Sequence, residues 1–200
     1  MRELAGRRPG RPWLVVGKGP TAPAAIAHAA GCHVVTLNHA CRLVRPDLAH
    51  FVDVEAVCDC RGDLGDAVLV VPWRPHCGCR PGPRTLDGYD WAAAAAARGR
   101  LASYQASTAP PDPSRPDLPR LRLRYFGAVA VFHLLAESGV REVWSAGVDG
   151  GRDYAAVFDR RTLLANGRRS FDDQFPEIDR LVRSYGLSWR RLPAAAPGGY

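Results

Sequence analysis

Short apolar runs alternate with segments of helical periodicity along most of the chain. Buried-type runs predict strands over residues 13–16, 33–37, 49–54, 67–71, 140–148 and 187–192, and an edge strand over residues 101–107. Apolar residues at helical spacing, bounded by Gly or Pro, predict helices over residues 22–30, 38–44, 126–138 and 170–185. The alternation predicts a Rossmann-like α/β fold, a mostly parallel sheet with helices on both faces.

Length and proline content define the predicted domain organisation. A chain of 200 residues corresponds to one domain, which we place at residues 1–192, followed by a flexible tail at 193–200. Residues 72–83 contain four prolines and residues 109–119 contain five, so neither stretch can be regular structure throughout. We interpret both as loops that close over a ligand.

The charge balance narrows the expected partners. The chain carries 27 basic and 20 acidic residues, a formal net charge of +7, and Lys18 is its one lysine. The arginines are scattered and no nucleic-acid-binding motif is present, so we expect an anionic small molecule and no nucleic acid. Apolar runs fall short of a membrane span, and no signal-peptide pattern is found. These features predict a soluble, cytoplasmic protein.

Six cysteines raise the alternatives of a metal site and of free thiols. Cys58, Cys60, His76, Cys77 and Cys79 lie within a short interval. Structural zinc sites favour at least two residues between paired cysteines, whereas here only one intervenes. We therefore expect reduced thiols and no resident metal.

A glycine-rich turn follows the first predicted strand. Gly17, Lys18, Gly19, Pro20 and Thr21 stand where a strand passes into a helix, the usual position of a phosphate-binding loop. Free backbone amides and the Lys18 ammonium could hold an anion there. An ordinary strand-to-helix turn is the alternative.

The residue that ends the second predicted strand argues against two common nucleotide motifs. That residue is Asn38, where an NAD-binding fold has an acid, so NAD is disfavoured and Asn38 becomes a candidate ligand contact. Lys18 is followed by Gly19 rather than Ser or Thr, which excludes a Walker A loop.

Two acidic groups are further candidates. Asp53 and Glu55 stand two residues apart at the end of a predicted strand, so we expect both on one face, where they could bind Mg²⁺ on a diphosphate or contact a ribose. Solvated acids at a strand end are the alternative.

The second acidic group follows a later strand. Its members combine carboxylates with glycines that permit close approach to a ligand, and we select Asp149, Gly150, Gly151, Asp153 and Tyr154.

Two histidines and one serine complete the candidates. His76 lies in the first proline-rich stretch and is the best candidate for a mobile general base. His133 falls on the apolar face of a predicted helix, where a core histidine is the simpler interpretation. Ser170 either contacts the ligand or only begins a helix.

These motifs, in this order, resemble the bacterial sialyltransferases of glycosyltransferase family forty-two. The matching residues are Gly17, Gly19, Pro20, Thr21, Asn38, Asp149 and Tyr154. The resemblance implies that the glycine loop and Asn38 bind a CMP-activated sugar and that Asp149 and Tyr154 serve the nucleotide phosphate. The segment where that family has its catalytic histidine, residues 170–174, contains none here.

The glycine loop also resembles the 6-hydroxymethylpterin pyrophosphokinase-like group, which transfers a diphosphate from ATP with magnesium. A further likeness, over residues 147–154, 164–167 and 170–172, is to a domain found with glycosyltransferases of bacterial surface polysaccharides.

Together these observations favour a nucleotide-dependent enzyme of the glycosyltransferase kind. Asp149 or Asp153 would act as base with help from His76, and the remaining candidates would bind the nucleotide. A Mg²⁺-dependent phosphoryl or diphosphoryl transferase or a nucleotide hydrolase, and a non-catalytic nucleotide-binding module, are the alternatives.

Overall fold

A single parallel sheet organises the chain. The computed structural model describes residues 10–78, 80–107, 110–122, 126–158 and 170–194. Within these ranges eight strands form one sheet, and every neighbouring pair in it is parallel. In spatial order they are β10 (Ser188–Arg191), β9 (Glu142–Ala146), β1 (Trp13–Val16), β2 (His33–Leu37), β3 (Leu48–His50), β4 (Val68–Pro72), β7 (Leu101–Ala106) and β8 (Arg120–Leu121). The predicted Rossmann-like α/β fold is confirmed.

Five α-helices and six 3-10 turns connect or cover the strands in the described ranges. The α-helices are α2 (Ala25–His28), α3 (Val54–Cys60), α4 (Asp90–Ala97), α5 (Gly127–Glu137) and α6 (Phe175–Tyr185). The 3-10 turns are η1 (Ala22–Ala24), η2 (Ala29–Gly31), η3 (Asn38–Arg42), η4 (Arg61–Asp63), η5 (Leu86–Gly88) and η6 (Phe171–Gln174). A small antiparallel hairpin pairs β5 (His76–Cys77) with β6 (Arg80–Pro81).

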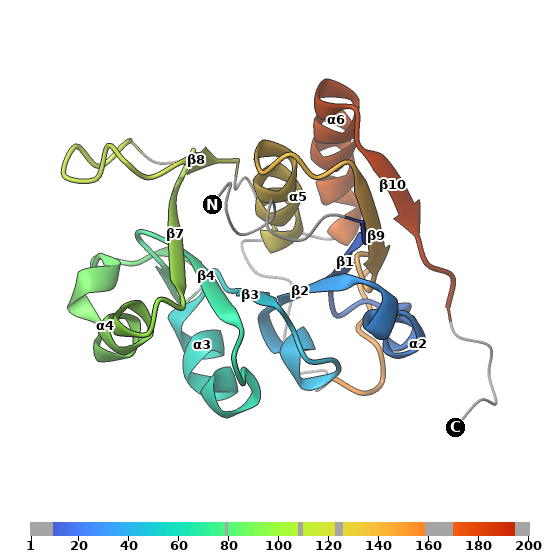
Figure 1. Cartoon of the computed structure of the whole chain (residues 1–200), viewed down its shortest axis with the longest axis horizontal. Coiled ribbons are helices and arrows are strands. Elements are labelled where there is room, and N and C mark those ends of the chain that lie inside the picture. The colour runs from blue at the N-terminus through green and yellow to red at the C-terminus, as the bar shows by residue number, and fades with distance from the viewer. Residues whose placement is uncertain (1–9, 79, 108–109, 123–125, 159–169, 195–200) are drawn as a thin grey trace.

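Helices cover both faces of the sheet, so its strands are apolar on both sides. Helices α5 and α6 lie on one face, and α2, α3 and α4 lie on the other (Figure 1). Along β1 the side chains alternate, with Val15 packing among residues of α5 and α6 while Leu14 and Val16 pack against the α2 side. Burial on both faces explains the continuous apolar run at residues 13–16.

Strand order reverses between β1 and β9. From β1 the chain builds β2, β3, β4, β7 and β8 in one direction, and β9 and β10 are then added on the other side of β1. In open parallel sheets ligands bind at the carboxyl ends of the strands near such a reversal. The turns that follow β1 and β9 are therefore the first place to look for a site.

Several sequence-based expectations about elements were wrong. The third strand ends at His50 rather than at residue 54, because residues 54–60 form helix α3. The helix expected at residues 22–30 is divided into η1, α2 and η2, with a proline in its first turn. Strand β7 is not at the edge, since β8 pairs with it.

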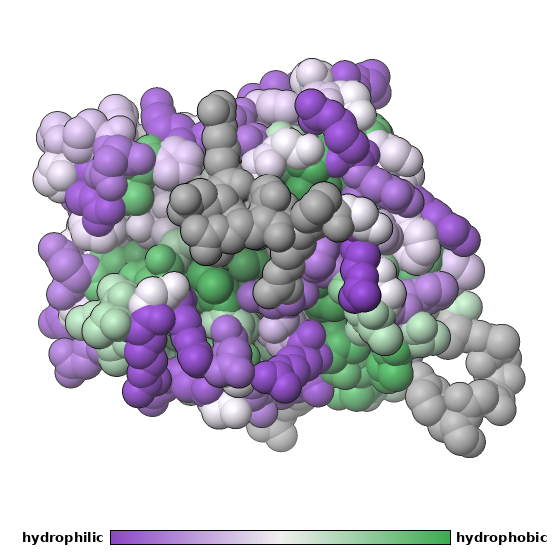
Figure 2. Space-filling view, viewed as in Figure 1, coloured by the Kyte–Doolittle hydropathy of each residue, from purple (hydrophilic) through white to green (hydrophobic). Residues whose placement is uncertain are grey.

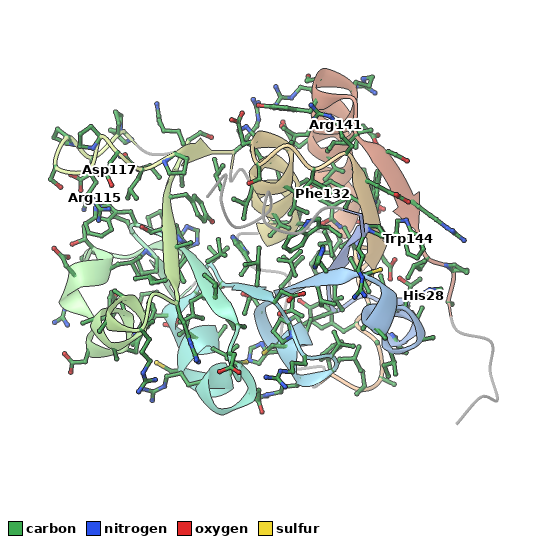
Figure 3. The ribbon with its side chains drawn as sticks, in the orientation of Figure 1. His28, Arg115, Asp117, Phe132, Arg141 and Trp144 are labelled. Carbon is green, nitrogen blue, oxygen red and sulfur yellow. The ribbon has the colours of Figure 1, made fainter. Side chains whose placement is uncertain are left out.

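The second proline-rich stretch is fastened to the sheet. Gln105 of β7 donates to the carbonyl oxygens of Arg115 (2.6 Å) and Asp112 (3.3 Å) and accepts from the Asp112 amide (2.6 Å). Arg115 also pairs with Asp117 (Figure 3). These bonds hold residues 110–119 beside the outer strands. The tail beyond residue 194 and the segment at residues 164–167 lie outside the described residues.

The surface seen in Figure 2 is mostly polar, with apolar side chains reaching it near α2. Ile26 of α2 is 48% exposed there. In the part of the chain that the structure describes, no helix has the length and apolar character needed to cross a membrane.

One polar pair lies inside the core. His50 of β3 is 1% exposed, and its Nε2 lies 2.9 Å from the hydroxyl oxygen of Tyr104 on β7. Burial lowers the pKa of His50 to about 3 and raises the pKa of Tyr104. His50 is therefore neutral in the folded protein at any pH at which the protein is ordinarily handled.

This burial makes stability depend on pH. The folded-state pKa of His50 lies below its unfolded value of about 6.5, so the unfolded chain takes up a proton that the folded chain cannot. Between pH 6.5 and pH 3 we expect the free energy of unfolding to fall by about 1.4 kcal/mol per pH unit from this group alone. Urea unfolding at several pH values measures this slope.

Two variants isolate the contribution of His50. His50→Gln should remove this part of the slope, although it lowers stability at pH 7, whereas His28→Gln, at a half-buried surface position, should keep it. An unchanged slope in His50→Gln would contradict the assignment.

Candidate functional site

Two glycine-containing turns meet where strand order reverses. The Gly17 amide donates to the Ala146 carbonyl (2.8 Å), and the Gly19 amide donates to the Gly147 carbonyl (2.9 Å). A Cβ on Gly17 would lie 2.2 Å from the Gly147 oxygen, and Gly147 itself has φ +71°. Only glycine lets the two backbones approach this closely.

Asp149 fastens the two turns together. Its Oδ2 accepts from the Thr21 amide (2.7 Å), and its carboxylate accepts from the Thr21 hydroxyl (2.8 Å). The same hydroxyl accepts from the Gly147 amide (2.7 Å). Both carboxylate oxygens of Asp149 are thus engaged by Thr21, so we assign Asp149 a positioning role rather than that of a proton acceptor.

The glycine loop offers a side chain to a ligand rather than a cradle of amides. The amides of Gly17, Gly19, Thr21 and Ala22 all donate within the protein. The expectation of free amides at these four positions was wrong, because β9 and the turn after it accept from Gly17, Gly19 and Thr21, and the Gly19 carbonyl accepts from Ala22. Lys18 remains the loop's candidate for holding an anion.

Four segments bring polar side chains to the carboxyl ends of β1, β2 and β3. Lys18 follows β1, Asn38 follows β2, Asp53 precedes α3 and His76 lies on β5. The His76 amide donates to the Val52 carbonyl (2.7 Å), and this bond holds the hairpin against the segment after β3. His76 Nδ1 then lies 4.0 Å from Asp53 Oδ1.

Burial shifts the pKa of three members of this group. It lowers the pKa of Lys18 and of His76 and raises the pKa of Asp53. The charges oppose these shifts, because Asp53 raises the pKa of Lys18 while His76 and Lys18 lower that of Asp53. The three groups therefore act as one electrostatic unit, and each neutral form is more accessible than it is in water.

Buried side-chain oxygen atoms at this edge have no hydrogen-bond partner among the described residues. They are Asn38 Oδ1, Asp53 Oδ1 and the hydroxyl oxygen of Thr36 on β2. Leaving a buried polar atom unpaired costs about 1–3 kcal/mol, so a ligand that donates hydrogen bonds here would recover that cost. Asn38 also has φ +50°, in the left-handed region, and such backbone outliers occur often at functional sites.

Aromatic rings line the β9 side of the site. Lys18 Nζ lies 4.3 Å from the centroid of the Tyr154 ring, and the Ala155 amide donates to the Lys18 carbonyl (2.8 Å). Phe171 lies 5.5 Å from Tyr154 and 5.3 Å from Phe126, measured between ring centroids. Tyr154 thus faces Lys18 and begins a row of three rings.

Three further candidates contact the segment that carries these rings rather than the polar side chains at the strand ends. They are Gly150, Gly151 and Ser170. A Cβ on Gly150 would lie 1.9 Å from the Asp172 carboxylate. The Ser170 hydroxyl donates to the Gly151 carbonyl (3.2 Å) and accepts from the Asp172 amide (3.1 Å) as the helix cap. Asp153 is exposed.

The expected placement of Asp53 and Glu55 at a strand end was wrong. Both belong to the start of α3 rather than to a strand end, where alternation would have put them on one face. Glu55 Oε1 accepts from the Gly78 amide (3.0 Å) and from the Cys77 thiol (3.2 Å). Glu55 therefore fastens the β5–β6 hairpin to α3.

The cysteines and His133 take structural positions. Cys60 is buried against Cys41, and Cys58 is exposed. Among the described residues, no three His, Cys, Asp or Glu side chains converge as a metal site, and Cys79 lies outside them. His133 accepts from the Arg122 amide (2.8 Å), as a satisfied histidine should.

Two site residues were missed at the level of sequence. Thr36 lies on β2 two positions before Asn38, which begins η3, and its buried hydroxyl oxygen has no hydrogen-bond partner among the described residues. His39 follows Asn38, and burial and the charge of Lys18 both lower its pKa. The end of the second strand was the available signal for both.

Comparisons with known proteins gave no family for this chain. A scan of the chain against protein-family models gave no match, and a search of curated proteins gave none either.

The role of Asp149 can be tested without a ligand. Asp149→Ala removes the acceptor for the Thr21 amide and hydroxyl, and we expect the free energy of unfolding to fall by about 2–3 kcal/mol. The melting temperature should drop by roughly 5–10 °C. Asp153→Ala is the matched control and should melt like the wild type, and equal melting of all three proteins would contradict the positioning role.

Proposed function

We propose that the chain binds a nucleotide or nucleotide-activated sugar over the ends of β1, β2 and β3 and acts as a transferase of the glycosyltransferase kind. The observation that carries the proposal is the combination of a half-buried ammonium, Lys18, with buried oxygens of Asn38 and Asp53 that have no hydrogen-bond partner in the described part of the chain. A phosphate suits the ammonium, and ribose hydroxyls or a base amino group suit the two oxygens. A nucleotide contains all of these groups.

His76 is the base in this proposal. Its lowered pKa keeps the imidazole neutral near pH 7, and the nearby carboxylate of Asp53 stabilises the imidazolium that forms. As an acceptor hydroxyl attacks the anomeric carbon of the donor, a carbon–oxygen bond forms and the bond to the nucleotide phosphate breaks. The hydroxyl proton passes to His76, and the phosphate leaves against Lys18.

The magnesium-dependent alternative has less support. The pair of carboxylates expected for the ion was Asp53 with Glu55, and Glu55 Oε1 instead accepts from Gly78 and Cys77. A non-catalytic nucleotide-binding module would need only the residues that bind the nucleotide. Turnover of a nucleotide sugar distinguishes the transferase from such a module.

Nucleotide binding is tested by thermal shift. We expect a cytidine, uridine, guanosine or adenosine nucleotide, screened with and without Mg²⁺, to raise the melting temperature. At 100 times Kd the gain is about 2.7 kcal/mol, or roughly 5–10 °C. Lys18→Met should abolish most of this shift, and Lys18→Arg, which keeps the charge, should retain part of it.

The outcomes of this screen separate the candidate functions. A shift seen only with a triphosphate and Mg²⁺ would favour phosphoryl transfer. No shift with any nucleotide would overturn the proposal.

Catalysis is tested at His76. In His76→Gln we expect the release of nucleotide from a bound nucleotide sugar to slow by about 10²–10⁴-fold while the thermal shift is preserved. In the wild type the rate should rise with pH through the lowered pKa of His76 and level off below pH 7. The variant Arg74→Gln, on the same loop but exposed, is the control. Equal rates in His76→Gln and the wild type would remove His76 from the mechanism.

A further inference from the structure

Strand β10 forms one edge of the main sheet. Within the described ranges it pairs with β9 alone and lies on the outer side of the sheet (Figure 1). The Ser188 amide donates to the Arg141 carbonyl (2.7 Å), so the backbone of Ser188 faces β9. Backbone groups alternate in direction along a strand, and those of Trp189 and Arg191 therefore point away from β9. These outward N–H and C=O groups are able to pair with a further extended segment.

Two consecutive arginines stand at this edge, on opposite faces of the strand. Arg190 Cζ lies 5.0 Å from the centroid of the Trp144 ring, on the side of the sheet that α2 covers. Arg191 Cζ lies 4.7 Å from the centroid of the Phe175 ring, which belongs to α6. Both arginines are exposed, and neither forms an ion pair with any described residue. Stacking on the rings thus holds two uncompensated positive charges, one on each side of the edge.

The arginines determine which partner fits the edge. A second copy of the chain is a poor partner, because pairing two β10 strands would bring the arginines of both copies close together, and like charges across a sheet are destabilising. A segment that carries carboxylates gains ion pairs instead. The planar guanidinium accommodates a carboxylate with two parallel hydrogen bonds, which favours acidic side chains over other anionic groups of a protein.

We propose that the β10 edge binds an extended acidic segment of another protein, which joins the sheet as a further strand. Main-chain hydrogen bonds to Trp189 and Arg191 supply part of the affinity, and side-chain charges supply the selectivity. Neighbouring side chains of an extended peptide point to opposite faces, so two adjacent acidic residues reach Arg190 and Arg191 together. Acidic residues two positions apart share a face and reach only one arginine.

This inference goes beyond the proposed transferase activity and does not depend on it. Strand β9 separates β10 from β1, and the proposed nucleotide site uses the ends of β1, β2 and β3. The peptide-binding edge therefore shares none of its residues with that site, and either proposal can fail without the other.

Fluorescence anisotropy with synthetic peptides tests the charge requirement. The probe is a labelled peptide of alternating threonine and valine with two adjacent glutamates at its centre, and the full chain is titrated into it at low ionic strength. We expect it to bind about five- to thirtyfold more tightly than the same peptide with two glutamines, and the difference should shrink at high salt. A peptide with the glutamates two positions apart should bind several-fold more weakly. Equal binding of the glutamate and glutamine peptides would overturn the proposal.

A methylated peptide distinguishes strand addition from simple charge attraction. N-methyl groups on its central amides keep both glutamates but remove the donors that pair with a strand. We expect this peptide to lose most of its binding. Unchanged affinity would show that the arginines attract acidic peptides without strand pairing and would overturn the proposal.

Substitutions locate the binding surface. Arg190→Gln and Arg191→Gln should each weaken binding of the glutamate peptide several-fold. Arg61→Gln, at an exposed arginine after α3, is the matched control and should bind like the wild type. Melting temperatures of all variants show whether the fold is retained. Equal binding by all three variants would place the peptide elsewhere and contradict the proposal.

A short single-stranded oligonucleotide is the competing polyanion. We expect it to displace the glutamate peptide only at concentrations above the Kd of the peptide. Displacement at lower concentrations, lost in the Arg190 and Arg191 variants, would assign the edge to nucleic acid and overturn the peptide proposal.

Discussion

The contact between the turns after β1 and β9 is the constraint on which the site depends. Gly17 and Gly147 pass so closely that a side chain on either would collide with the opposite backbone, and Asp149 locks the pair through Thr21. This contact lies where strand order reverses, the usual place for a ligand in such sheets. Hydrogen bonds within the protein occupy the amides of Gly17, Gly19 and Thr21 at this contact, and Lys18 remains the loop's candidate for contacting a ligand.

Polar groups next to this contact are held at an energetic cost. Lys18 is half-buried, and buried oxygens of Asn38 and Asp53 have no hydrogen-bond partner among the described residues. The rest of the sheet can support such a group because its strands are buried on both faces by α5 and α6 on one side and by α2, α3 and α4 on the other. A stable scaffold thus maintains a locally unfavourable arrangement, as binding sites generally require.

Sequence reasoning succeeded where one residue's environment is set by its neighbours in the chain. The first two strands were predicted at both ends, because runs such as residues 13–16 are apolar throughout and end at glycine or asparagine. Correct strand ends placed Lys18 and Asn38 at one edge of the sheet. The prediction of the third strand failed near Asp53. Residues 49–54 alternate like a strand, but the last of them begins helix α3.

Interactions between distant residues could not be predicted from spacing. Thr21 and Asp149 are 128 positions apart, so nothing in either local pattern indicates that one carboxylate accepts two bonds from the other residue. The partners of Glu55 could not be predicted for the same reason, since Cys77 and Gly78 lie on a hairpin that the proline-rich composition does not indicate.

That hairpin divides the site into separately adjustable parts. His76 reaches Asp53 only because β5 and β6 are joined to the main body through the Val52 carbonyl and the Glu55 carboxylate, whereas Lys18 and Asn38 stand directly on the sheet. The proposed base is therefore carried on a short hairpin that is separate from the strand ends bearing Lys18 and Asn38. Such a hairpin could be lengthened, shortened or exchanged without rebuilding those strand ends, and it gives protein engineers a place to alter the proposed base separately from the proposed nucleotide-binding residues.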